Sequence, residues 1–181
     1  MKTLIISFFI LNFILLNAQI SLESLRLDYP KVISNKELCQ SLILDLEKTK
    51  IRGAELAYLG ALQTIWANHL NNPFQKLSTF KKGKKNIEKA VELNPDNLEV
   101  RFLRLSIQHN SPKILGYNNM MKEDKDFIVK NFNHIKNKNL EHLILSFFKD
   151  SDLLSQQEIV LIMKTEKLQI DSFMNLKNNK L

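Results

Sequence analysis

The fold of this chain is decided by residues 53–97, GAELAYLGALQTIWANHLNNPFQKLSTFKKGKKNIEKAVELNPDN. Two Asn-Pro pairs, Asn72-Pro73 and Asn94-Pro95, divide this stretch. Each pair stops one helix and starts the next, because a proline at the first helical position lacks only an amide donor that would have no partner there. On both sides of the pairs, apolar residues recur at the spacing of a helix with one buried face. The stretch therefore predicts three successive helices joined by short turns.

Small side chains mark the first of these helices, which we expect to start at Gly53. They recur at helical spacing and would let a neighbouring backbone come close. These residues are Ala54, Ala57, Gly60, Ala61 and Thr64. Bulky apolar residues lie between them, so this helix is predicted to be central to the core. Its tryptophan, Trp66, is interpreted as a core anchor rather than as a stacking platform for a ligand.

The second helix, which starts at Pro73, is the most basic stretch of the chain. Its lysines are Lys76, Lys81, Lys82, Lys84, Lys85 and Lys89. The simplest interpretation is a solvated face whose lysine stems cover apolar surface. The alternative hypothesis for the same residues is an anion-binding or membrane-surface face.

The third helix, predicted over residues 95–109, carries the candidate binding residues Arg101, Arg104 and Gln108. Counted from Asn97 they follow at i+4, i+7 and i+11, which aligns them on one side of the helix. Two arginines on an otherwise apolar helix need carboxylates or an anionic ligand if they are even partly buried. We therefore expect any binding surface of this protein to use these side chains.

Acidic residues on the next helix, predicted over 119–133, offer a structural explanation for the same arginines. Asp124 and Asp126 lie near the start of that helix, which is the favourable end for negative charge. Internal pairing of the two arginines with one of these aspartates is the alternative to a ligand site.

The composition predicts an all-α fold. Only four glycines and four prolines punctuate 181 residues, too few for the many turns of an all-β protein of this size. Capping boxes at Ser34-x-x-Glu37 and Ser155-x-x-Glu158 predict further helix starts, and residues 140–148 form another apolar-periodic segment. We expect about six to seven antiparallel helices, by the same periodicity, in a repeat-like array or an irregular bundle.

The first eighteen residues are typical of a secretory signal peptide. Lys2 precedes an apolar run over residues 4–16, which is shorter than a bilayer span, and cleavage is expected after Ala18. The protein is thus predicted to be exported, most simply to the periplasm, with secretion or membrane tethering by an uncleaved leader as alternatives. The remaining divisions expected are an extended N-terminal segment at 19–33, a single helical domain at 34–176 and a polar tail at 177–181.

The sequence contains no catalytic signature. Its net charge of +7 is scattered rather than gathered with aromatic residues, which argues against nucleic-acid binding. The single cysteine, Cys39, lies among apolar residues of a predicted helix and is interpreted as core packing rather than as an intermolecular disulfide or a nucleophile. The four histidines lack metal-ligand spacing, and no phosphate loop or nucleophile elbow is present. We therefore expect no cofactor, no metal and, more simply, no enzyme.

A short segment resembles a known repeat family. Gly83, Ile87, Ala90 and Pro95 follow at intervals of four, three and five residues, and the turn Asn94-Pro95-Asp96-Asn97 lies between two amphipathic helices. This pattern, over about fifteen residues, resembles the second helix and inter-repeat turn of a tetratricopeptide repeat (TPR) in a degenerate form. The resemblance implies stacked helix pairs that bind a peptide or a partner protein rather than catalyse a reaction.

Two functional hypotheses follow. The first is an exported helical module that binds a protein or peptide of unknown identity and contacts a membrane only if its leader is retained. The second is a binder of a small anionic ligand, or an enzyme, with a cleft near the predicted helices at 53–70 and 95–109.

Overall fold

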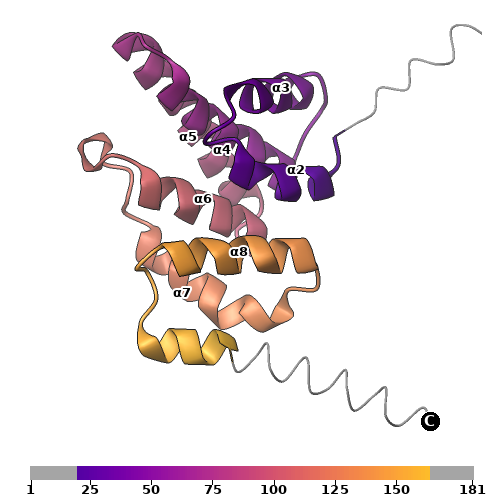
Figure 1. Ribbon diagram of the computed structural model, residues 1–181, viewed down its shortest axis with the longest axis vertical. Coiled ribbons are helices and arrows are strands. Elements are labelled where there is room, and N and C mark those ends of the chain that lie inside the picture. The colour runs from indigo at the N-terminus through magenta and orange to yellow at the C-terminus, as the bar shows by residue number, and fades with distance from the viewer. Residues whose placement is uncertain (1–19, 164–181) are drawn as a thin grey trace, which may run out of the picture.

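The computed structural model describes residues 20–163, and Figure 1 shows that these form helices joined by short loops. The predicted leader at 1–18 and the polar tail at 177–181 lie outside the described residues. The α-helices are α2 (Leu22–Asp28), α3 (Lys36–Glu47), α4 (Gly53–His69), α5 (Pro73–Leu93), α6 (Leu98–Asn110), α7 (Met121–Asn131) and α8 (Lys138–Asp150). Another α-helix begins at Gln156, and the 3₁₀ turns are η2 (Tyr29–Lys31), η3 (Lys113–Leu115) and η4 (Phe132–His134). The all-α prediction is confirmed, with eight α-helices and no strand among the described residues, against six to seven expected.

The extra helix is α2, and it corrects the expectation of an extended segment at 19–33. The Ser21 side chain accepts a hydrogen bond from the Ser24 amide at 3.0 Å and caps the helix. Leu25 in α2 and Tyr29 in η2 are one helical turn apart, and both are buried in the core. A helix of seven residues is too short to be stable alone, so tertiary burial of these two side chains holds it.

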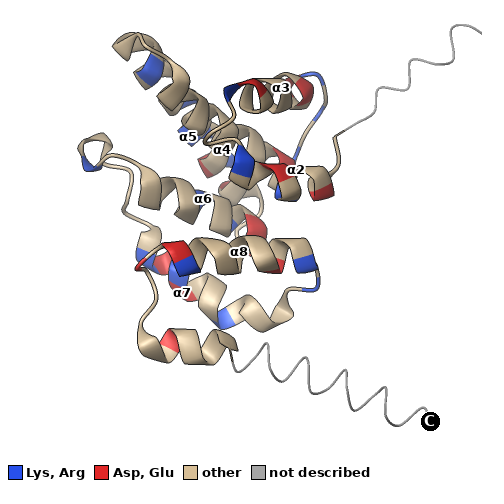
Figure 2. Ribbon diagram, in the orientation of Figure 1, with Lys and Arg blue, Asp and Glu red and all other residues tan. Residues whose placement is uncertain are grey.

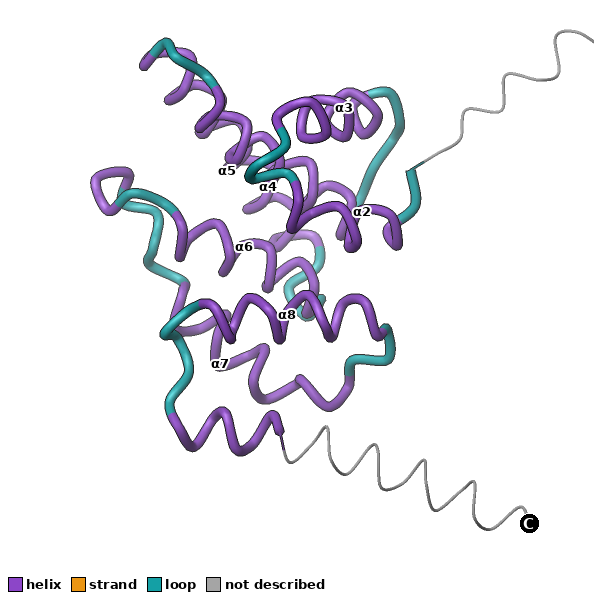
Figure 3. The backbone as a smooth tube through the Cα atoms, in the orientation of Figure 1, coloured by secondary structure: helices purple, strands orange, loops and turns teal. Residues whose placement is uncertain are grey.

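The hairpin of α4 and α5 is the centre of the fold, and its loop projects at the upper left of Figure 3. Gly60 of α4 and Gly83 of α5 lie against each other. A Cβ built on Gly83 would be 2.5 Å from the Gly60 carbonyl oxygen, and one built on Gly60 would be 2.7 Å from the Gly83 carbonyl oxygen. The two backbones are therefore in contact, as the small-residue strip predicts.

Helix α6 connects this hairpin to the C-terminal half. It packs against α4 and α5 on one side and against α7 and α8 on the other, as Figure 1 shows. Val100, Leu103 and Leu105 are fully buried, because neighbours cover α6 on most sides. The first helix of the described residues, α2, packs against α8 and α4.

The two capping boxes predicted from the sequence can be compared with the helix caps in the structure. The capping box at Ser155 is confirmed, because the Glu158 carboxylate accepts hydrogen bonds from both the amide and the hydroxyl of Ser155 at 2.8 Å. The one predicted at Ser34 is wrong by one residue. Asn35 caps α3 by accepting from the Leu38 amide at 2.9 Å, whereas the Ser34 hydroxyl donates back to the Lys31 carbonyl.

The start of α6 also differs from the expected one at Pro95. Asn97 caps this helix by accepting a hydrogen bond from the Val100 amide at 3.1 Å. Pro95 and Asp96 form the turn before it, so here the proline precedes the cap instead of occupying the first helical turn.

Two side chains singled out in the sequence lie at different depths. Cys39 is fully buried as a free thiol. Trp66 is only half-buried, with the Lys36 ammonium 5.5 Å from its ring centroid, so it lies at the edge of the core. In the described part of the chain, no helix combines the length and apolarity required to span a membrane.

The Gly60–Gly83 contact predicts that Gly83→Ala destabilises the protein. Alanine normally favours a helix over glycine, but here its methyl group would meet the Gly60 carbonyl. We expect a loss of about 1–3 kcal/mol in the free energy of unfolding, measured by urea denaturation. Ser78→Ala, at an exposed position of the same helix, should change it by less than about 0.5 kcal/mol. Equal or greater stability of Gly83→Ala would contradict the backbone contact.

The confirmed capping box predicts a pH-dependent contribution to stability. Hydrogen bonds from Lys125 and Ser155 lower the pKa of Glu158 from 4.5 to about 2. A depressed carboxyl pKa stabilises the fold above the unfolded value of 4.5, and this stabilisation is lost as the pH falls through about 2. The stability difference between the parent and Glu158→Gln, from urea unfolding at several pH values, should shrink over this window. A difference that stays constant with pH would contradict the assignment.

Candidate functional site

Arg104 lies in the centre of a buried ionic network. Its guanidinium donates to both carboxylate oxygens of Asp124, through Nε at 2.7 Å and Nη2 at 2.8 Å, and to Glu88 through Nη1 at 3.0 Å. The Tyr117 hydroxyl donates to the other oxygen of Glu88 at 2.6 Å. One guanidinium thus joins α5, α6 and α7. Arg104 is buried and Asp124 is completely so.

Arg101 joins the same network from its outer side. It donates to Glu123 through Nη1 at 2.8 Å, and its Nε lies 3.1 Å from an Asp124 oxygen. The guanidinium also covers the Phe127 ring, 4.7 Å from the centroid. Asp124 therefore partners both arginines, whereas Asp126 pairs with Lys122 and lies in none of the arginine pairs.

The energetics of this network favour a structural role. Burial raises the pKa of Asp124 in spite of the adjoining arginines, so the attraction does not fully offset the cost of removing the carboxylate from water. Burial opposes the charge of Arg104, yet its pKa is raised, because Asp124 and Glu88 hold the guanidinium charged. The partners neutralise one another and leave little charge for a ligand.

Gln108, the third predicted binding residue, is buried one turn beyond Arg104. Only 1% of its surface is exposed, and neither its amide nitrogen nor its amide oxygen has a hydrogen-bond partner within residues 20–163. A buried amide without partners is costly. The structure brings the three predicted residues onto one side of α6, but the wall of neither cavity described below includes them.

A second buried ion pair was not predicted from the sequence. Arg26 of α2 donates to both oxygens of Glu99 in α6, through Nε at 2.8 Å and Nη2 at 2.7 Å. The Tyr58 hydroxyl of α4 donates to the same carboxylate at 2.9 Å. This pair fixes α2 to the core, and the only hint in the sequence was an arginine in a segment expected to be extended.

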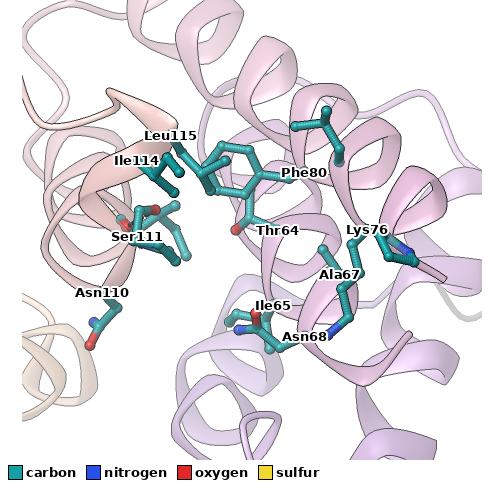
Figure 4. A pocket seen from close by; sticks show the side chains of 14 residues that line it. Thr64, Ile65, Ala67, Asn68, Lys76, Phe80, Asn110, Ser111, Ile114 and Leu115 are labelled. Carbon is teal, nitrogen blue, oxygen red and sulfur yellow. Dashed lines mark hydrogen bonds between the residues drawn. The ribbon is translucent and has the colours of Figure 1, made fainter. Parts of the chain in front are cut away.

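An apolar opening lies where α4, α5, α6 and η3 meet. A cavity of about 350 Å³ separates the α4–α5 hairpin from the C-terminal end of α6, and Figure 4 shows the two walls facing each other. Its lining is Thr64, Ile65, Ala67, Asn68, Pro73, Lys76, Leu77, Phe80, Ile107, Asn110, Ser111, Pro112, Ile114 and Leu115. Leu77 and Ile114 are exposed, with Ile114 at 93%. Exposed apolar side chains beside an apolar cavity are typical of a binding surface.

A second cavity, of about 420 Å³, adjoins the first. It lies between η2, α4, α6 and α8, and four residues line both cavities: Ile65, Asn68, Ile107 and Asn110. We name the two together the α4–α6 groove. Lys76 lines its first cavity and Asp150 its second, so the groove carries opposite charges in its two halves.

The side chains that line the groove are mainly apolar and amide groups. Within the described residues, no group of three or more histidine, cysteine, aspartate or glutamate side chains could hold a metal ion. Burial raises the pKa of the Cys39 thiol to about 11, which keeps it protonated and a poor nucleophile at neutral pH. The groove offers apolar surface, amide side chains and two isolated charges.

The second hypothesis from the sequence placed a cleft near α4 and α6, but sequence reasoning missed the residues that line the groove, because its walls come from distant segments. One local signal was present: Ile114, which is 93% exposed, lies in a turn between Pro112 and Gly116, next to Leu115, which packs partly against the core. Gly116 ends this turn with a left-handed backbone, at φ 57°. A comparison of the chain with protein-family models, curated proteins and solved structures found no match.

The Arg104 network predicts a large loss of stability when one partner is removed. Arg104→Ala leaves Asp124 buried without its main partner, and we expect a loss of about 3–5 kcal/mol in urea unfolding. The double variant Arg104→Met/Asp124→Leu should recover most of that loss, because apolar pairs replace buried ion pairs well. Arg52→Ala, at an exposed arginine, is the control and should be nearly neutral. Unchanged stability of Arg104→Ala would contradict internal pairing.

Proposed function

We propose that this protein is a noncatalytic helical module that binds a segment of a partner protein in the α4–α6 groove. The main observation in support of this proposal is that the two cavities share lining residues and so form one groove, whose walls are predominantly apolar. Fully exposed Ile114 and partly exposed Leu77 border the opening. An occupant that covers them would remove apolar surface from water, which is the main source of affinity at such sites.

The charges of the groove define its occupant. Lys76 and Asp150 are exposed, and neither forms an ion pair within residues 20–163. A fitting partner is therefore an amphipathic segment with apolar anchor residues, an acidic residue at the hairpin half of the groove and a basic residue at the α8 half. Such charge complementarity fixes the direction in which a segment binds.

Two features of the sequence support this function and its location. The residues that carry the TPR resemblance in α5, namely Gly83, Ile87 and Ala90, are all buried in the hairpin, consistent with a degenerate TPR-like hairpin used for protein binding. The predicted leader supports action outside the cytoplasm, with the periplasm as the simplest location.

The alternative hypothesis, an anionic-ligand or catalytic cleft between the same helices, lacks its expected residues. It needs Arg101 and Arg104 to face a cleft, and both are occupied by Asp124 and its acidic neighbours. The groove does lie between α4 and α6, but its wall is mainly apolar and contains a single cation, Lys76.

The peptide-binding proposal is tested by selection from a displayed random peptide library against the full chain. Enriched sequences should combine apolar anchors with an acid at one end and a base at the other. Their binding, measured by fluorescence anisotropy, should weaken at least about tenfold in Leu77→Lys, because a charge would enter the apolar wall. Leu44→Lys changes a leucine of similar exposure on α3 (50% against 42%) and is the matched control.

A charge swap separates direct contact from indirect effects. Lys76→Glu should weaken the selected peptides, and a peptide whose acidic residue is replaced by lysine should regain affinity for this variant alone. Failure to enrich any peptide, or equal binding to Leu77→Lys and Leu44→Lys, would overturn the proposal.

A further inference from the structure

Three lysines on the outward face of α5 form no ion pair among the described residues, and the exposed Glu92 follows them on the same side near the end of the helix. Phe74, Lys81, Lys85 and Lys89 are spaced at i, i+7, i+11 and i+15, which places them on one side of the helix. All four are exposed, Phe74 at 86%. We name this surface the α5 lysine face.

The lysines of this face lack the nearby acidic partner that most paired lysines elsewhere in the described structure have. Lys31, Lys48 and Lys122 each pair with an aspartate one turn away on the same element or its neighbour. In α5 no acidic residue occurs before Glu88, so most of the helix lacks such partners. Figure 2 shows basic and no acidic ribbon along its projecting part.

We propose that the α5 lysine face docks on an anionic lipid membrane. Lysines near an anionic bilayer are attracted to its headgroups, and an aromatic ring is favourable in the interfacial region. Phe74 lies beside the hairpin loop, at the projecting end of the hairpin (Figure 3), so it can reach a flat surface first. The lysines alone would also fit an acidic protein partner. The exposed aromatic ring in line with them favours a membrane over such a partner.

Docking of this kind is peripheral, and it uses a surface of α5 that borders the α4–α6 groove. The apolar side of α5, with Phe80 and Ile87, is buried in the core, so the helix cannot turn that side into lipid without unfolding. Of the groove residues Leu77 and Phe80, Phe80 points away from the α5 lysine face, whereas Leu77, four residues before Lys81, lies at its border. The membrane proposal therefore does not rest on the proposed peptide-binding function.

The test uses the full chain with vesicles of phosphatidylcholine alone or mixed with phosphatidylglycerol. An environment-sensitive nitrobenzoxadiazole label is attached at Ser78→Cys, which lies in line with Phe74 and Lys81, or at Ser41→Cys on exposed α3 as the control. The natural Cys39 is fully buried and stays unlabelled. Only the label at position 78 should shift its emission to the blue, only with the anionic vesicles, and added salt should reverse the shift.

Charge variants test whether the face or merely the net charge is responsible. In the Ser78→Cys background, Lys81→Gln/Lys85→Gln/Lys89→Gln should weaken the response to anionic vesicles about tenfold or more. Lys130→Gln/Lys136→Gln/Lys149→Gln removes the same charge from exposed lysines around α7 and α8 and should retain it. Phe74→Ser should weaken binding while leaving the salt dependence unchanged.

Several outcomes would overturn the proposal. One is equal emission shifts at positions 41 and 78, which would indicate tethering through another part of the chain. Another is equal loss in the two triple-lysine variants, which would indicate a net-charge effect. A third is binding to a soluble polyanion such as heparin without any response to vesicles, which would make an acidic polymer the partner.

Discussion

Gly60 and Gly83 bring the backbones of α4 and α5 into contact, and the rest of the structure is arranged around that contact. Because no side chain separates the two helices at this point, their spacing is fixed by main-chain atoms. Helix α3 packs on α4, and α6 packs on both helices of the hairpin. The groove residues Ile65, Asn68 and Leu77 all come from the half of the hairpin between this contact and its loop. The position of the groove therefore depends on where the two glycines lie.

Two buried ion pairs set the positions of the helices that pack on the hairpin. Glu99, at the start of α6, accepts hydrogen bonds from Arg26 of α2. Arg104, about a turn and a half later in α6, donates hydrogen bonds to Asp124 of α7. Buried pairs of this kind add little stability over well-packed apolar residues. They do penalise any arrangement that leaves one charge unpaired, so they select one position of α2 and α7 relative to α6. The apolar core supplies the stability, and the pairs supply this specificity.

The sequence predicts the hairpin well because its signals are local. Pro73 and Gly53 mark helix starts, the small-residue strip indicates the close contact, and the Ser155 capping box works through residues three apart. The helix α2 was missed because it is short and depends on tertiary burial of Leu25. Whether Asp124 or Asp126 pairs with the arginines depends on which side of α7 faces α6. The periodicity of the sequence near a helix start does not determine that side. A cleft near α4 and α6 was one hypothesis from the sequence, but the residues that line the groove could not be predicted, because its walls come together only in the folded chain.

The two kinds of cation in this protein lie in different environments. Arg26, Arg101 and Arg104 are enclosed by carboxylates, and the planar guanidinium suits such fixed pairing. Lysine, a hydrated point charge on a flexible stem, remains at the surface of α5. Buried arginine thus organises the helices, whereas the two proposed binding surfaces consist of apolar side chains and lysines. Because Leu77 of the groove is one helical turn from Phe74 and Lys81, the groove and the lysine face border each other on α5.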